Sequence, residues 1–232
     1  MEGININIFR KVIRASKVII NKFYLIILLV LPKFFNSLLE IEKNNKFNTV
    51  LSEKYYVYLP LVIIILLTPV IYFEFYKKFI NKDMTFINIL KKYIGPFITS
   101  SILISFLFLF MKIPYYISFF IAKETILQNI ILEVTKISYI YVTVMVYPII
   151  FYNDLSGYDS VIFSIKFIIK NIKETYLFIL IIVIQRIFYG LIEFFIHNFN
   201  KTDYLWELLF LQNTVLVFFQ VLLFSTAVIY LK

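Results

Sequence analysis

The chain has 232 residues and a formal net charge of +9; 61% of its residues are hydrophobic and only 16% are charged. A soluble domain is usually about half apolar and about a quarter charged. The apolar excess is gathered in runs that approach the roughly 20 residues a helix needs to cross a bilayer. Because backbone groups in lipid must be paired within the segment, the composition predicts an all-α polytopic membrane protein.

The same numbers exclude several kinds of site. With no cysteine in the chain, disulfides, thiol catalysis and cysteine-based metal sites are ruled out. The single histidine, His197, argues against a histidine-rich metal site and against a histidine-dependent triad. No P-loop, H-E-x-x-H or G-x-S-x-G motif occurs. We therefore expect a protein that is not an enzyme and that uses no metal and no other cofactor.

Six membrane spans can be read in chain order. The first contains Pro32 and the second Pro60 and Pro69, and prolines inside membrane spans usually kink them. The N-terminal stretch lacks the compact apolar core and cleavage site of a signal peptide, so the first span is expected to stay in the mature chain. The predicted spans are Phe23–Leu39, Tyr56–Tyr76, Ile94–Met111, Ile126–Tyr152, Thr175–Ile196 and Tyr204–Leu231.

Lysine and arginine counts predict the orientation. With the N-terminus inside, fourteen of these residues fall on the inner side and seven on the outer side. Positive charge favours the cytoplasmic side and anionic lipid. We therefore expect a multi-pass protein of the cell membrane with both termini cytoplasmic, and we read the net charge as contact with an anionic inner leaflet rather than with nucleic acid.

Basic residues on the inner side recur at helical spacing before the first, third and fifth spans. The segment before the fifth span is predicted to place Ile162, Ile165 and Ile169 on an apolar face opposite its lysines. A basic face opposite an apolar face is typical of a helix that lies in the membrane interface. The predicted membrane-surface residues are Arg10, Arg14, Lys17, Lys91, Lys92, Lys166, Lys170 and Lys173.

This arrangement indicates a threefold helix-hairpin repeat within one membrane domain, with units 1–76, 77–152 and 153–232. Each unit would hold a basic interfacial helix, a span going out, an outer loop and a span coming back. The alternative is that segments rich in isoleucine and lysine match one another by composition alone.

The segment "YPIIFYNDLSGYDSVIFSIKFIIKN" carries Pro148, Asp154, Asp159, Ser164 and Asn171. A proline near the end of the fourth span is followed by an acidic turn, a serine-containing basic helix that ends in asparagine, and two more spans. In this order the chain resembles the six-pass prokaryotic proteins related to the membrane domain of some glycerophosphodiester phosphodiesterases. The resemblance implies six spans and a non-catalytic role; it implies no substrate.

Arg186 lies at the centre of the fifth span and calls for a partner. An arginine in the middle of a bilayer costs from about 3 to more than 10 kcal/mol unless it faces a counter-ion or water. Glu193, two turns further on, is about 10.5 Å away along the axis, so Glu133 or Glu207 in neighbouring spans is the better partner. The predicted intramembrane polar cluster is Glu133, Lys136, Arg186, Glu193 and Glu207. It would either line a hydrophilic cavity or fix the register of the helices.

Three further residues are predicted to mediate helix packing. Gly190 follows Arg186 by one turn and would let a neighbouring helix approach closely. Asn213 and Gln220 share a face of the sixth span, where interhelical hydrogen bonds are expected, with pore lining as the alternative. The stretch "NDLSGYDS" is predicted to be a turn and the start of a helix rather than a calcium loop.

Three functions stay open at this level. The first is an accessory or assembly protein that forms a complex with a membrane partner. The second is a permease-type transport subunit driven by a separate ATPase, which would dock on Asp83–Gly95 with Lys91 and Lys92. The third is a structural subunit of a large membrane complex.

Overall fold

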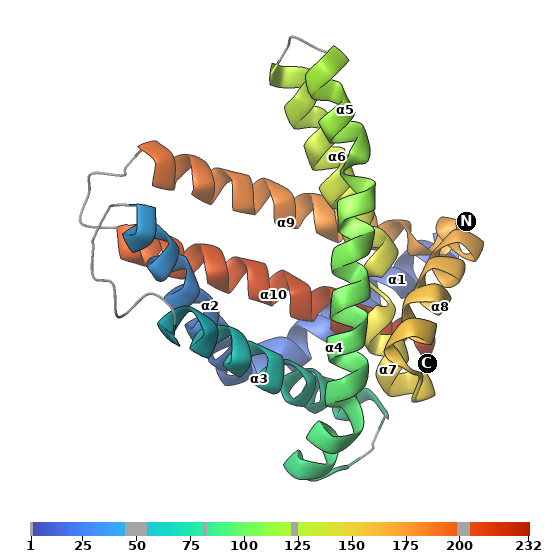
Figure 1. Cartoon of the computed structure of the whole chain (residues 1–232). Helices are drawn as coiled ribbons and strands as arrows, with labels where there is room; N and C mark the ends of the chain where they lie inside the picture. The colour runs from blue at the N-terminus through green and yellow to red at the C-terminus, as the bar shows by residue number, and fades with distance from the viewer. Residues whose placement is uncertain (1, 45–54, 81–82, 122–124, 199–204) are drawn as a thin grey trace.

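The structure is a computed structural model, and it describes residues 2–44, 55–80, 83–121, 125–198 and 205–232 (Figure 1). Every regular element within these ranges is a helix, as predicted. The helices are α1 Glu2–Asn21, α2 Phe23–Asn44, α3 Tyr55–Ile80, α4 Phe86–Met111, α5 Ile113–Ile121, α6 Thr125–Thr143, α7 Val146–Asn153, α8 Gly157–Lys170, α9 Ile172–Asn198 and α10 Leu205–Leu231.

Four helical stretches are long and apolar enough to cross a membrane within the described ranges. They coincide with the third to sixth predicted spans, although the predicted start at Tyr204 lies outside the described residues. The fourth predicted span is broken by a turn between α6 and α7. The composition is thus that of a multi-pass membrane protein. The four stretches are Phe86–Ser118, Ile126–Asn153, Ile172–Ile196 and Trp206–Leu231.

The first two predicted spans are helical but differ from the other four. Helix α2 is apolar and long enough to cross a membrane only when it is taken together with the end of α1. The two helices are bent by 75° at the break between them, and as one bent span they would be a fifth candidate. Helix α3 is not among the candidates; its described part carries Glu74, Lys77 and Lys78 close to its end. Each charge reduces the apolar length on which a span depends.

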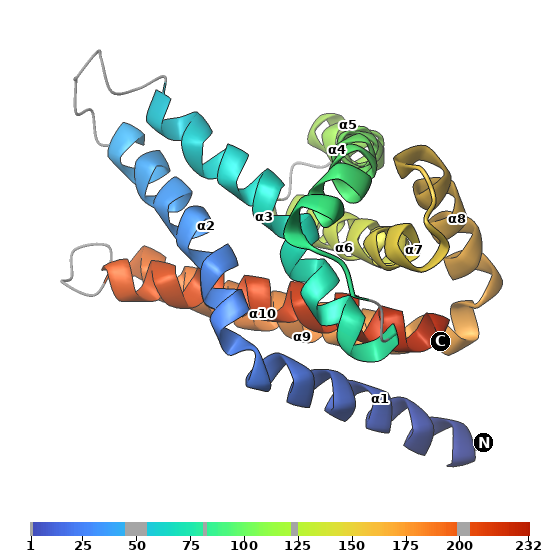
Figure 2. The same ribbon diagram turned by 90° about the horizontal axis from the view of Figure 1, so that it is seen from below.

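The helices form two groups that meet at one end (Figures 1 and 2). The four-helix group consists of α2, α3, α9 and α10. The hairpin arm consists of α4, α5 and α6 and runs crosswise to the four-helix group in Figure 1. Helices α1, α7 and α8 and both chain termini lie at the junction, which we call the terminal end.

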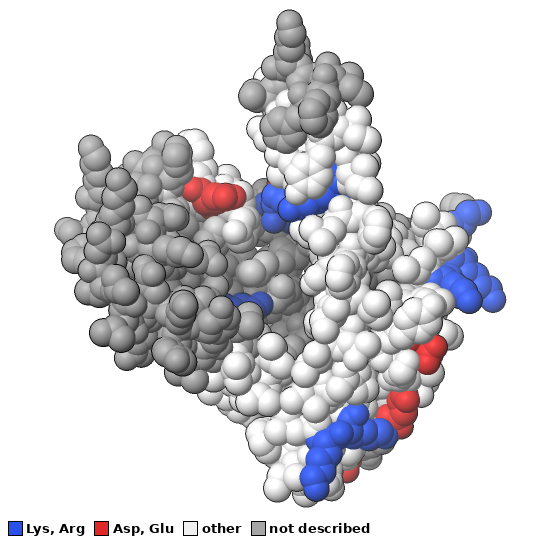
Figure 3. All heavy atoms as spheres, viewed as in Figure 1, with Lys and Arg blue, Asp and Glu red and all other residues white. Residues whose placement is uncertain are grey.

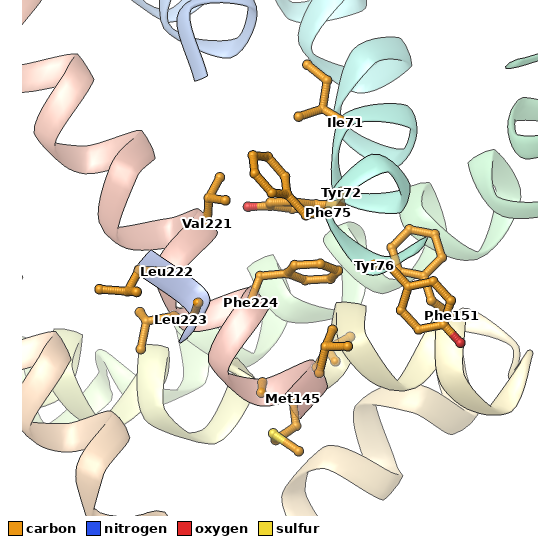
Figure 4. Close-up of a cluster of buried hydrophobic side chains, with 14 of the residues drawn as sticks. Ile71, Tyr72, Phe75, Tyr76, Met145, Phe151, Val221, Leu222, Leu223 and Phe224 are labelled. Atoms are coloured by element: carbon orange, nitrogen blue, oxygen red, sulfur yellow. The ribbon is translucent and has the colours of Figure 1, made fainter. Parts of the chain in front are cut away.

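Aromatic rings join the two groups at this junction. The ring centroid of Tyr72 in α3 lies 6.3 Å from that of Phe97 in α4; Tyr72 also stacks on Phe224 of α10 at 4.5 Å, and Phe97 stacks on Tyr147 of α7 at 4.7 Å. Figure 4 shows the rings of Tyr72 and Phe224 facing one another, and Phe151 of α7 beside Tyr76. Lipid is as apolar as these side chains, so helices in a membrane associate through close packing rather than through a hydrophobic drive. Tight ring contacts are therefore what we expect to hold the groups together.

Helix α8 packs against α4 through small side chains. Gly157, Ser160 and Ser164 lie on its buried face, and the Ser164 hydroxyl also donates to the carbonyl of Val142 in the neighbouring helix α6 at 2.8 Å. The predicted apolar face of Ile162, Ile165 and Ile169 is not the face that packs against α4, since Ile169 is 69% exposed. That this face lies in the membrane interface stays a prediction. Only a face of small residues lets the backbone of α8 approach α4 so closely.

The turn before α8 follows the prediction. Asp154 adopts a left-handed conformation with φ of 52°, and Ser156 caps α8 by accepting a hydrogen bond from the backbone N–H of Asp159 at 3.1 Å. The Ser156 hydroxyl also donates to the Asp159 carboxylate at 2.7 Å. This reciprocal pairing is a capping box built on an aspartate. It fixes the start of α8 and the entry of the chain onto α4.

The basic segments fall into two kinds. On α1 and α8 the predicted basic residues are exposed, while Ala15 and Ile19 of α1 are buried on the side that packs against α10. The third segment differs: α4 runs without a break from Phe86 through Lys91 and Lys92, so no separate interfacial helix precedes it. The exposed basic residues of α1 and α8 are Arg10, Arg14, Lys17, Lys166 and Lys170, and Lys173 is exposed on α9.

Candidate functional site

A cavity of about 450 Å³ lies between the two helix groups. Helices α2, α3 and α10 line one side, and α4, α6 and α7 line the other. Figure 3 shows the molecule hollowed between the hairpin arm and the four-helix group, with basic side chains at this hollow. Its volume falls within the roughly 300–1,000 Å³ of ligand pockets. The polar lining residues are Lys33, Thr68, Tyr72, Ser101, Tyr139, Thr143, Tyr147 and Gln220.

Lys33 is the one charged residue among the described lining residues of this cavity. Its ammonium group donates to Oε1 of Gln220 on α10 at 2.7 Å. This contact joins α2 to α10 across the cavity wall. Lys33 was not predicted as a site residue, because in the sequence it reads only as a charge that weakens the first span. The feature of the sequence that could have indicated a site residue was the position of Lys33 between two apolar runs of the same span.

Most other polar groups of the wall are paired within the protein. The Thr68 hydroxyl donates to the carbonyl of Ile64 at 2.6 Å, and the Thr143 hydroxyl donates to the carbonyl of Tyr139 at 2.8 Å. The hydroxyls of Ser101 in α4 and Tyr147 in α7 share a hydrogen bond of 3.0 Å. Lys33 therefore differs from these residues, since its partner is neutral and its charge is not compensated there.

A second charged site connects α6 with α9. Arg186 donates from Nε to Oε2 of Glu133 at 2.9 Å and from Nη2 to Oε1 at 2.8 Å. Lys136 Nζ contacts the same Oε1 at 2.7 Å, and the Arg186 guanidinium lies 5.1 Å from the ring centre of Tyr189. The bidentate geometry is the strong form of an arginine–carboxylate pair. We call Glu133, Lys136 and Arg186 the charged triad; its formal charge is +1.

The predicted polar cluster is confirmed in part. Glu133 is the partner of Arg186, as expected of the carboxylates in neighbouring spans, and the Arg186 side chain is only 19% exposed. Glu193 and Glu207 do not join the triad; both are exposed, and neither forms an ion pair with a described residue. Glu193 is too far along α9 to reach Arg186, and the carboxylate of Glu133 already accepts hydrogen bonds from Nε and Nη2.

The prediction of close helix packing at Gly190 is wrong. A Cβ added there would meet nothing within 4 Å, and the residue is exposed. The close approach occurs instead at Gly157, where a Cβ would come within 2.5 Å of the carbonyl oxygen of Pro96. Both glycines lie in helices, so sequence alone gave no means of telling which one faces a neighbour.

The predicted interhelical face of α10 is confirmed. Asn213 donates from Nδ2 to the Ser37 hydroxyl at 3.2 Å, and Gln220 accepts from Lys33. Both partners belong to α2, as two residues seven apart on one helix would allow. Gln220 also lines the cavity, so at this position the pore-lining alternative and the hydrogen-bond reading both apply.

Ion pairs and hydrogen bonds tie the elements together at the terminal end. Lys22, at the break between α1 and α2, contacts Glu74 of α3 at 3.0 Å. Lys92 contacts Asp154 at 2.7 Å, and the Tyr93 hydroxyl donates to the same carboxylate at 2.8 Å. These contacts join α4 to the turn before α8. Lys92, predicted as a membrane-surface residue, thus also has a structural partner.

Comparison of the chain with protein-family models, with curated proteins and with solved structures finds no match. The described residues also contain no group of three or more histidine, aspartate or glutamate side chains placed to share a metal ion. Function is therefore inferred from the cavity, from Lys33 and from the charged triad.

Proposed function

We propose that the chain is a six-pass protein of the cell membrane with both termini cytoplasmic, and that it acts as a non-enzymatic, permease-type transport subunit. Its solute passes through the cavity between the two helix groups. A separate ATPase supplies the energy, as the alternative drawn from the sequence states. The observation that carries the proposal is the cavity of about 450 Å³ with Lys33 in its wall.

The topology is supported by the position of the two termini. Both lie at the terminal end of the molecule (Figure 1), which an even number of spans requires. Exposed basic side chains of α1 and α8 gather at the same end, and basic residues favour the cytoplasmic leaflet. Six spans need α2 and α3 to cross as well as the four candidate stretches.

The transport role is supported by the size and chemistry of the cavity. Protein interiors are packed closely and keep few voids larger than a water molecule. A protein that served only to fill space between partners would gain nothing from a void of this size. Nor would it gain from a lysine held there by a neutral amide, because a charge at membrane depth is costly.

The accessory and structural roles have less support. Side chains such as Phe106, Phe110 and Phe194 are exposed and apolar, and lipid covers such faces as well as a partner helix does. Exposed apolar side chains are therefore expected of an assembly protein and of a transporter alike, and they do not distinguish the two roles. Both roles, and the resemblance to the membrane domain of glycerophosphodiester phosphodiesterases, stay predictions from the sequence.

The proposal is tested by cysteine accessibility, for which the absence of native cysteine is an advantage. Ser101→Cys places a single thiol in the cavity wall, and Ser105→Cys places one a turn further along α4, outside the lining. Membrane vesicles of both orientations, from cells that carry the chain and its partners, are treated with a charged, membrane-impermeant thiol reagent. We expect Ser101→Cys to react from both sides in turn, with and without ATP, and Ser105→Cys to react from neither. Labelling of Ser101→Cys that is absent from both sides would contradict transport through this cavity.

The ATPase partner is tested separately. The structure describes the whole of the expected docking segment, Asp83–Gly95. Before α4 begins, Asp83 and Thr85 of this segment are exposed. Lys91 is exposed, whereas Lys92 is held by Asp154, so Lys91→Glu is the cleaner change. We expect Lys91→Glu to abolish co-purification of an ATPase, and Lys112→Glu, at the opposite end of α4, to preserve it. Equal recovery with both variants would contradict docking at this segment.

A further inference from the structure

Within the part of the chain that the structure describes, the charge of Lys33 has no counter-ion. Its hydrogen-bond partner among these residues is the amide oxygen of Gln220, which is polar but neutral. By contrast, Arg186 and Lys136 share the carboxylate of Glu133, and Lys22 contacts that of Glu74. Buried charges in proteins are normally paired, because one left alone loses its hydration without compensation. At Lys33 no described residue supplies such a partner, so the charge is open to an anion from outside the chain.

Lys33 also lies deep along its helix. It follows Lys22, at the terminal end of α2, by eleven residues. At 1.5 Å per residue this is about 16 Å along the axis, roughly half of a hydrocarbon core about 30 Å thick. Intramembrane charges at such depth are rare and mark substrate pathways or ligand counter-ions. The position therefore favours an anionic ligand over a contact with phosphate groups at the membrane surface.

The remaining wall of the cavity is largely apolar. Ile65 of α3 and Ile98 and Ile102 of α4 belong to the lining and are also 38%, 40% and 52% exposed, respectively. These side chains lie both in the wall and at the surface, so the mouth between α3 and α4 is apolar. A small hydrophilic ion would gain nothing from such a wall, whereas an apolar chain would replace contacts with lipid at little cost.

We propose that the cavity binds one amphipathic anion, which consists of an apolar chain and a carboxylate or phosphate head. The head pairs with the ammonium group of Lys33 while Gln220 keeps that group in place. The chain lies against the isoleucines of α3 and α4 and enters from the bilayer between these helices. This inference rests on the proposed function, since it names the class of solute for the same cavity.

The test is ligand retention by the full chain in detergent micelles, measured by native mass spectrometry. Oleate supplies a carboxylate head, dioleoylphosphatidic acid a phosphate head, and oleyl alcohol is the matched neutral probe. We expect one oleate or one phosphatidic acid per chain and at least about tenfold weaker retention of oleyl alcohol, a factor that corresponds to about 1.4 kcal/mol. Retention of one anion and not the other identifies the head group, and either result supports the proposal.

Variants locate the binding site. Lys33→Gln is expected to weaken retention of the anion about tenfold or more, and Lys33→Arg to preserve it, because only the former removes the charge. Ser101→Phe, at an exposed lining position, should block the cavity with Lys33 intact. The matched control Lys112→Gln removes a lysine that lies over the ring of Phe108, away from the cavity, and should leave retention unchanged.

Two results would overturn the proposal: equal retention of oleate and oleyl alcohol, or retention by Lys33→Gln that matches the wild-type chain. The proposed function fails in a different way. If the anion is retained in a Lys33-dependent manner but Ser101→Cys is never accessible from the aqueous phase on either side, the chain binds the anion without transporting it.

Discussion

Gly157→Ala is expected to destabilise the packing of α8 on α4 more than its size suggests. The added Cβ would lie 2.5 Å from the carbonyl oxygen of Pro96, 2.7 Å from the amide nitrogen of Ser100 and 2.8 Å from Cβ of Thr99. Two of these three atoms belong to the backbone of α4, so no side-chain rotation relieves the contact.

The magnitude follows from the displacement required. Ordinary van der Waals contact of a Cβ begins near 3.4 Å, so α8 and α4 would have to separate by roughly 0.9 Å at this point. Overpacking of this kind typically costs about 1–3 kcal/mol. Gly190→Ala is the matched control. Nothing lies within 4 Å of its added Cβ, so the helix propensity of alanine should make it neutral or stabilising by up to about 1 kcal/mol.

The assay is reversible unfolding of the full chain in mixed micelles as sodium dodecyl sulfate is increased, followed by circular dichroism. We expect the two alanine variants to shift the midpoint in opposite directions, or Gly157→Ala alone to lower it. Equal midpoints would refute the close contact between α8 and α4, and a lower midpoint for Gly190→Ala would show that a helix packs there after all.

Three further outcomes are expected. A double-mutant cycle of Arg186→Leu and Glu133→Gln should give a coupling free energy of about 1–2 kcal/mol in the same unfolding assay, because the pair is bidentate but partly exposed; additive effects would mean that the pair is not formed. Arg186→Lys should retain only part of this coupling, since lysine cannot bind a carboxylate in bidentate geometry; full retention would argue against that geometry. Asn213→Leu should cost about 0.6–2 kcal/mol through loss of the hydrogen bond to Ser37, and an unchanged midpoint would count against this contact between α10 and α2.

The apolar runs of the sequence were sufficient to predict the helices, because long stretches without charges leave few other conformations in lipid. They also led to the pairing of Arg186, since an arginine within such a run demands a carboxylate and Glu133 was one of few available. Asn213 and Gln220 were found by the same reasoning from polar residues on one helical face.

Features that depend on how the helices are placed were not accessible in this way. Gly157 follows a predicted turn and Gly190 lies inside an apolar run, and only the position of α4 shows that the first is the one at a close contact. The face of α8 that packs on α4 was not predicted, because its glycine and serines give no apolar pattern, and lipid is as good an environment as a neighbouring helix for an isoleucine such as Ile169. The role of Lys33 depends on its contact with Gln220, which lies 187 residues away in the chain.

The most direct test of the anion-binding cavity combines its geometry with its charge. The rate at which a thiol reagent modifies Ser101→Cys is measured with and without oleate, in chains that carry either lysine or glutamine at position 33. With Lys33 present, oleate should slow modification about tenfold or more, and with Lys33→Gln it should have little effect. Protection that is equal in both chains, or absent from both, would contradict a Lys33-dependent anion site in this cavity.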